Sequence, residues 1–241
     1  MNLSQFVGAG LRAKDFTSSE TWTIPAGVRL LKLLAIGGGG SGGAMGPSFT
    51  PSTTSFFYGG GGGRVLMADV PLVGGEEVVV TIGAGGASVT ASGSNTAPGN
   101  DGGTTTVLVR VAADPDIARG HFVANGGGGG GAAGSSHTGH GVGGGKALSA
   151  LFGGGSGHHN PPGIVQTNEF FHAPTNSGAA FAGTTINGNV VRCYGGGHCF
   201  GRGGDGSVAG SGSGGSGYGS GGGAGRGQSG AGAPGIVIIW Y

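Results

Sequence analysis

Short apolar, β-branched runs alternate with glycine-dense segments along this chain. The apolar runs are of strand length, and helical periodicity is nearly absent. They fall in four regions that predict the strands of a β core: residues 21–36, 64–82, 104–125 and 236–241. Several short strands separated by turn signals are typical of an all-β sandwich. We therefore expect an all-β fold built on a small β-sandwich.

One pair of runs predicts a hairpin. The run RVLMADVPL at 64–72 and the run EEVVVTI at 76–82 lie on either side of Val73-Gly74-Gly75. Two β-prone runs around a Gly-Gly turn favour antiparallel pairing with each other. We expect the two strands to be neighbours in one sheet.

The glycine-dense segments are residues 37–63, 83–103 and 126–235, and each begins where a predicted strand ends. Glycine loses more backbone entropy on folding than any other residue, so ordering these segments requires many compensating hydrogen bonds. Extended helices of the polyproline II type point their backbone groups outward, where neighbouring helices could bond to them. We expect packed, left-handed glycine helices of the polyglycine II type that project from the strand ends. Disordered loops are the alternative.

Composition narrows the function classes. The chain has 66 Gly among 241 residues, 11 Lys and Arg, 10 Asp and Glu, and a net charge of +1. So few basic residues cannot form the positively charged surface that binds the phosphates of nucleic acid, and we expect no nucleic-acid partner. The longest apolar run, 28–36, contains Arg29 and Lys32 and is too short to span a bilayer, so we expect no membrane insertion. Residues 1–16 lack the features of a signal peptide, which predicts assembly in a cytoplasm.

Catalytic motifs are weak. Residues 39–43 (GGSGG) match the nucleophile-elbow pattern after a strand, but no helix is predicted to follow. The acidic residues, with Glu76 and Glu77 in a turn, form no convincing pair for glycoside cleavage. We expect a protein that is not an enzyme, with no catalytic residue and no cofactor.

The cysteine and histidine residues near position 198 allow three interpretations. Cys193 and Cys199 flank His198, which permits a metal site, although the spacing is not that of a standard zinc finger. A Cys193–Cys199 disulfide and two free thiols are the other readings, and a reducing compartment favours thiols. We assign no metal site.

Aromatic and histidine side chains among the glycines are the candidate recognition groups. Large rings at loop tips offer contact area at low rotamer cost. The alternative is that they cap the core or pack against a neighbouring subunit. The candidates are Phe57, Tyr58, His158, His159, Phe170, Phe171, His172, Tyr194, His198, Phe200 and Tyr218.

Several motifs, in this order, resemble the glycine-rich domain of bacteriophage tail-fibre and tail-tip proteins. The resemblance covers roughly residues 16–131 and 226–241, and residues 132–225 have no counterpart motif. The motifs are Phe16-Thr17-Ser18-Ser19 with Thr21 to Val28, the strand and glycine tract of Leu33 to Gly43, Val80 to Gly86, Gly102 to Thr105, and Gly232 to Trp240.

The resemblance implies a virion component of the phage tail that is assembled in the host cytoplasm. It implies other tail proteins and a bacterial surface receptor, glycan or protein, as partners, and a homo-oligomer for which we favour a trimer. We expect residues 1–20 to attach to another tail protein and residues 21–241 to form one glycine-rich β domain. The function expected is host attachment by non-catalytic receptor binding. A purely structural tail or baseplate component, with the glycine-rich face buried between subunits, is the alternative.

Overall fold

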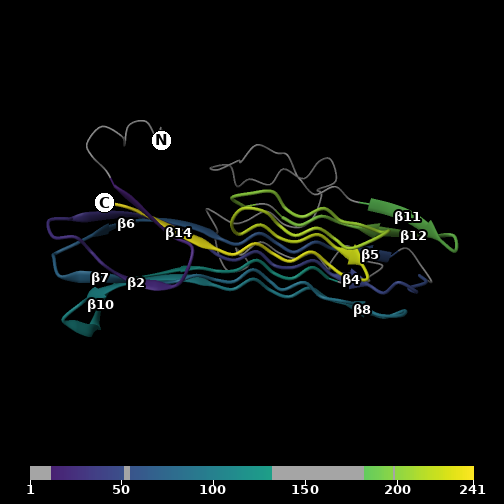
Figure 1. Cartoon of the computed structure of the whole chain (residues 1–241), viewed down its shortest axis with the longest axis horizontal. Helices are drawn as coiled ribbons and strands as arrows, with labels where there is room; N and C mark the ends of the chain where they lie inside the picture. Colours follow the sequence, from purple (N-terminus) through teal and green to yellow (C-terminus); the bar gives the residue numbers. More distant parts are fainter. Residues whose placement is uncertain (1–11, 52–54, 132–181, 198) are drawn as a thin grey trace.

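The computed structural model describes residues 12–51, 55–131, 182–197 and 199–241. Its regular elements in this part of the chain are strands, so the prediction of an all-β fold is confirmed. The molecule is elongated, with two larger sheets at one end and two small sheets at the other, and glycine segments run between them (Figure 1). We call the two larger sheets the β core and the glycine segments between the ends the glycine body.

The β core consists of two four-stranded sheets. The first has the order β1-β14-β3-β6 and the second the order β10-β9-β7-β2, and all pairs in both are antiparallel. The strands of the first sheet are β1 (Ala13–Phe16), β14 (Ile236–Trp240), β3 (Leu30–Ile36) and β6 (Val65–Pro71). Those of the second are β10 (Asp114–Ala124), β9 (Thr105–Val111), β7 (Glu76–Thr81) and β2 (Glu20–Thr23).

Alternating side chains of the two sheets share one hydrophobic core. In β7 the side chains of Val78 and Val80 are buried while Val79 is only partly buried, as expected for a strand with one face toward the core. In β9, Val107 and Val109 alternate in the same way. The first sheet contributes apolar residues to the same cluster: Phe16, Leu31, Leu33, Ala35, Val70, Val237 and Ile239.

The predicted hairpin of residues 64–82 is wrong. β6 pairs with β3 in the first sheet, whereas β7 pairs with β2 and β9 in the second. The connection therefore crosses between sheets, and Gly74 and Gly75 have φ values of 119° and 78°. The buried Glu76 carboxylate accepts hydrogen bonds from the N–H groups of Val73 (3.0 Å) and Gly74 (2.7 Å), which holds the crossing in place. Burial alone would raise the pKa of Glu76, but these bonds, with Arg119 nearby, lower it below its usual value.

The N-terminal boundary also differs from the one expected. β1 lies within the residues assigned to an attachment segment, 1–20, yet it pairs with β14, and Phe16 is buried in the core. Arg12 and Tyr241 exchange two backbone hydrogen bonds of 2.9 Å at the same edge. Residues 12–20 therefore belong to the β domain, while residues 1–11 lie outside the described part of the chain.

The two small sheets close the other end of the molecule. One has the order β11-β12-β5, with β11 (Ala182–Ile186), β12 (Asn189–Cys193) and β5 (Ser55–Phe57). The other has the order β13-β4-β8, with β13 (Gly225–Arg226), β4 (Ala44–Met45) and β8 (Thr96–Ala97). β11 and β12 form a hairpin whose turn, Asn187-Gly188, has positive φ at both residues. The sequence carries this Asn-Gly signal, but our sequence analysis did not identify it.

The glycine body is ordered by hydrogen bonds between neighbouring segments. Segment 37–43 continues β3 and is buried along its length. Its N–H groups donate in a cycle of three residues to three antiparallel neighbours, segments 58–64, 99–103 and 230–233. The acceptors for residues 37 to 43 in turn are the carbonyls of Arg64, Gly103, Ala233, Gly61, Asn100, Gly230 and Tyr58, at distances from 2.8 to 3.1 Å.

The carbonyls of segment 37–43 bond to three further neighbours. Gly127 and Gly130 donate to the carbonyls of Gly38 and Ser41, and segment 222–225 donates to those of Gly40 and Gly43. Gly86 donates to the carbonyl of Gly39. Among the described residues this segment is therefore bonded to six others. A cycle of three residues is the repeat of a polyproline II helix, in which each residue turns its groups by about a third of a turn.

A second segment has the same environment. In segment 219–225 the N–H groups of Gly221 and Ala224 donate to segment 194–197, and those of Gly222 and Gly225 donate to segment 37–43. Its carbonyls accept from segments 58–64, 204–207 and 230–233. The two buried segments, 37–43 and 219–225, thus lie side by side at the centre of the body, and the undulating parallel traces of Figure 1 show this arrangement along the long axis.

Close approach of backbones explains why glycine fills these segments. A Cβ atom at Gly40 would overlap the carbonyl oxygen of Gly128, and one at Gly60 would overlap that of Gly40. Neither residue has a positive φ, so its backbone conformation would accept other residues. Glycine is required because the neighbouring backbones leave no room for a Cβ atom. In contrast, a Cβ at Gly214 on the surface would have Ala231 O as its nearest neighbour at 3.5 Å, an ordinary contact.

Gly40→Ala is expected to destabilise the fold, whereas Gly214→Ala serves as the matched control. The added methyl group at residue 40 must push a neighbouring backbone away, which costs roughly 3 kcal/mol in overpacking and weakened hydrogen bonds. The control should change the free energy of unfolding by less than about 0.5 kcal/mol. Denaturant unfolding followed by tryptophan fluorescence measures both. Equal stabilities for the two variants would contradict the packing described for segment 37–43.

Candidate functional site

The predicted recognition residues separate into three groups. Phe57, Tyr58 and Tyr194 are buried, and Phe200 and Tyr218 lie at the surface, where Phe200 is 47% exposed and Tyr218 is partly exposed. The remaining candidates lie outside the described residues: His158, His159, Phe170, Phe171, His172 and His198. Of the described candidates, the structure therefore brings only Phe200 and Tyr218 to the surface.

The three buried rings pack on the two faces of the β11-β12-β5 sheet. Phe57 joins a cluster with Met45, Val191 and Cys193. On the other face Tyr58 stacks on Tyr194, with ring centroids 5.4 Å apart and planes at 12°, and Phe56 lies beside both rings. Burial, and after it the neighbouring Tyr194, raises the pKa of Tyr58 to about 12. These rings stabilise the far end of the glycine body in this structure.

Phe200 and Tyr218 begin a polar ladder on the surface of the glycine body. Their backbones form an antiparallel bridge with two N–H···O bonds of 3.1 and 2.9 Å. The same two segments continue the pairing through Arg202 with Ser216 and through Asp205 with Ser213. We call residues 200–205 and 213–218 the outer ladder. Both Gly201 and Gly217 have a positive φ and come close to the opposite backbone at its start.

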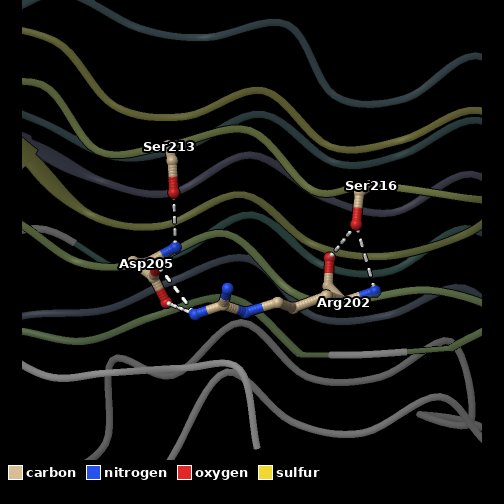
Figure 2. A network of polar contacts seen from close by, with 4 residues as sticks. All are labelled: Arg202, Asp205, Ser213 and Ser216. Atoms are coloured by element: carbon tan, nitrogen blue, oxygen red, sulfur yellow. Dashed lines mark hydrogen bonds and ion pairs between the residues drawn. The ribbon is translucent and has the colours of Figure 1, made fainter.

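Serine hydroxyls complete the hydrogen bonding of this ladder. The Arg202 N–H donates to Ser216 Oγ (3.2 Å), and that hydroxyl donates to the Arg202 carbonyl (3.2 Å). The Asp205 N–H donates to Ser213 Oγ at 2.6 Å. Figure 2 shows Ser213 and Ser216 spaced along one segment, where they face Asp205 and Arg202 on the next segment. The members of each pair are three residues apart, and both bond to the opposite segment, Arg202 to Ser216 and Asp205 to Ser213.

The Arg202 and Asp205 side chains form an ion pair along the surface. Arg202 Nη2 donates to both carboxylate oxygens of Asp205, at 2.9 and 3.0 Å (Figure 2). The side chains are 62% and 39% exposed, so solvent screens the pair and its contribution to folding is small. Its geometric effect is larger, because it fixes both side chains along the ladder.

The sequence analysis missed the four polar residues of the ladder. Their signal is a spacing of three in two separate glycine tracts, Arg202 with Asp205 and Ser213 with Ser216. That spacing acquires a meaning only when each tract is a helix with three residues per turn.

The two cysteines are free thiols in different clusters. Cys193 packs with Phe57 and Val191, while Cys199 packs with Ile36 and Tyr218. Burial raises the pKa of each thiol to about 12. Among the described residues no group of three or more His, Cys, Asp or Glu side chains is arranged to hold a metal ion.

Two comparisons with known proteins bear on this chain. A family model described as a glycine-rich domain matches residues 15–241. No curated protein matches the chain. Within the described residues, no helix has the length and apolar character needed to cross a membrane.

The buried thiols predict a loss of stability at alkaline pH. Their pKa is raised in the folded state from about 9 to about 12, so the contribution of the protonated thiols is fully present below pH 9. It is lost as the pH rises through the folded value, because only the unfolded chain releases the protons in between. We expect the free energy of unfolding to fall with pH in this window.

The double variant Cys193→Ala/Cys199→Ala is the control, because alanine has no proton to release. Its unfolding free energy should depend less steeply on pH than that of the wild type, measured by denaturant titration over the same window. Identical pH dependences would show that the thiols ionise equally well in the folded chain.

Proposed function

We propose that this chain, which belongs to the glycine-rich domain family, is a bacteriophage tail-tip or tail-fibre protein that attaches the particle to its host by non-catalytic receptor binding. In this proposal it is a virion component, assembled in the host cytoplasm, with no cofactor. It acts as a homo-oligomer, with a trimer favoured, so that several weak contacts add in avidity.

The observation that carries the proposal is the construction of the glycine body. Segments 37–43 and 219–225 bond to neighbours on all sides, so the body is a rigid support rather than a set of loops. On its surface it carries the outer ladder, with exposed Phe200 and Arg202. The start of this ladder, at Tyr218, packs beside Ile36 of the β core. A rigid support that presents aromatic and polar side chains is suited to binding a surface without chemistry.

The free end of the β core suits attachment to the particle. Val73, in the connection between β6 and β7, is 70% exposed there, and Leu30 at the start of β3 and Ile117 in β10 are each 44% exposed. The rings of Trp22 and Tyr241 are in contact, with centroids 4.9 Å apart and planes tilted by 53°. Exposed apolar side chains gathered at one end of a molecule favour contact with another protein. We assign this end to other tail proteins and the opposite part to the receptor.

The sequence resemblance supports the same proposal. The motif Thr21 to Val28 spans β2 and the loop before β3, and Gly232 to Trp240 leads into and along β14. These motifs form the β core from which the glycine body extends.

A purely structural tail or baseplate component is the second candidate. It is favoured by the burial of Phe57, Tyr58 and Tyr194, which removes three aromatic residues from the possible contact surface. In that case the glycine-rich face would lie between subunits.

Labelled, purified protein is expected to bind candidate host bacteria saturably and to compete with whole particles for adsorption. Multivalent contact gives slow dissociation, so binding should persist through washing. Binding is measured by fluorescence on intact cells, and competition by counting unadsorbed particles. A correctly oligomeric protein that neither binds nor competes would contradict receptor binding and favour the structural candidate.

Val73→Asp is expected to separate assembly from adhesion. A charge at the exposed connection between β6 and β7 should weaken docking to the particle, because a carboxylate is costly to bury in an apolar contact. Incorporation into particles should fall, while cell binding by the isolated protein should remain. Met67→Asp is the control, because Met67 is also well exposed, at 49%, but lies within β6 of the first sheet. Normal incorporation of Val73→Asp would contradict the assignment of this end.

A further inference from the structure

We propose that residues 1–11 turn back over the outer face of the first sheet and cover it within the same chain. The outer face consists of Leu34, Met67, Ile238 and Trp240, on the side of the sheet opposite the shared hydrophobic core. The proposal concerns the β domain itself and does not depend on the attachment function.

Strand alternation separates these side chains from the core. Leu33 and Ile239 belong to the core cluster that the two sheets share, whereas Leu34 and Ile238 belong to a separate cluster. Neighbouring residues of a strand point to opposite sides of a sheet, so the second cluster lies on the outside. Leu34 is directly opposite Ile238 in β14 and Met67 in β6. The outside of the first sheet therefore carries an apolar row that crosses three strands.

The corresponding side of the second sheet is polar. Thr21 is exposed there, and Glu77 and Arg110 form an ion pair of 2.7 Å. An antiparallel sheet with one face in water normally alternates apolar and polar residues, as the second sheet does. The first sheet carries the Lys32–Asp69 ion pair on its outside, but its strand β14 reads IVIIW and is apolar on both sides. This asymmetry indicates that something covers the first sheet.

The described elements cover the outer face only in part. Cys199 and Tyr218 of the glycine body pack against the same cluster. Met67 nevertheless is 49% exposed, and Ile238 and Trp240 are partly exposed. Adjacent apolar side chains left exposed on a folded domain mark a contact surface.

Residues 1–11 begin beside this face and suit it in composition. They join the sheet at Arg12, whose backbone exchanges two hydrogen bonds with Tyr241, and Ala13 is opposite Trp240. The segment reads MNLSQFVGAGL, which includes two leucines, a phenylalanine and a valine but no Asp, Glu, Lys, Arg or His. An apolar segment tethered beside an apolar face meets that face at a high effective concentration.

The segment is also long enough to turn and cross the face. Gly8 and Gly10 lie shortly before β1, and glycine permits the backbone conformations of a tight turn. Eleven extended residues reach about 36 Å, whereas three neighbouring strands span about 10 Å. After the turn, Leu3, Phe6 and Val7 can therefore contact β14, β3 and β6. Covering these apolar side chains removes them from water and stabilises the domain.

Photo-cross-linking of the full-length protein tests where the segment lies. A benzophenone amino acid takes the place of Phe6, and irradiation bonds it to groups within reach, which peptide mass spectrometry identifies. We expect bonds to the peptides of β6 and β14 in a product with the mass of one chain. The same bonds in a product of two chains would make the outer face an interface between copies instead. Absence of bonds to the first sheet would contradict the proposal and leave residues 1–11 available to another protein.

Oxidation of Met67 by peroxide measures the cover independently. An exposed thioether is oxidised to the sulfoxide more readily than a buried one. Phe6→Asp should raise the oxidation rate of Met67 about tenfold, because a carboxylate is costly to place against apolar side chains. Gln5→Asp adds the same charge at a neighbouring polar residue and should leave the rate unchanged.

Met45 is the internal reference for this experiment, because it is fully buried in the small cluster at the other end of the molecule. Its slow oxidation in each variant establishes that the fold is retained. Equal oxidation rates of Met67 in the wild type and in both variants would show that residues 1–11 do not cover the outer face.

Discussion

The contact of one backbone with another, without side chains between them, is the interaction on which this structure depends. In segment 37–43 every N–H group finds a carbonyl on a neighbouring segment, and the carbonyls are shared among three other neighbours. Such contact is possible only where a Cβ atom is missing, as at Gly40 and Gly60. Ordering glycine is entropically expensive, so the body requires nearly complete hydrogen bonding to persist. Glycine content and hydrogen-bond density are therefore two aspects of one requirement.

The β core sets the starting positions of this arrangement. β3, β7 and β10 run directly into glycine segments, while β6, β9 and β14 are entered from them. Strands in a sheet are held a few ångströms apart by the same type of hydrogen bond that joins the glycine segments. The sheets thus bring the segments to bonding distance before the glycine body forms. At the surface, the few polar side chains among the glycines, such as those of Arg202 and Ser216, bond to neighbouring groups.

The sequence was informative where the signal was local. The apolar runs located β3, β9 and β14 closely, because short apolar, β-branched runs bounded by turn signals are typical of strands. Strand pairing was harder to predict. β6 and β7 are separated by a Gly-Gly turn, yet β6 pairs with β3 in the first sheet and β7 pairs with β9 in the second. The burial of the aromatic side chains could not be predicted from the sequence either. Phe57 and Phe200 both stand beside glycine tracts, and only the position of each tract in the body, at its centre or at its surface, decides which is buried.

The cycle of three residues also constrains how such a chain can change length. Removing one residue from segment 37–43 would rotate every later residue by a third of a turn and offer each N–H to the wrong neighbour. Removing three would restore the direction of every group. The interior of the glycine body therefore has something like a reading frame in its amino acids, in which insertions and deletions are acceptable in threes. The turns that connect the segments carry no such frame, and length can vary freely there during evolution.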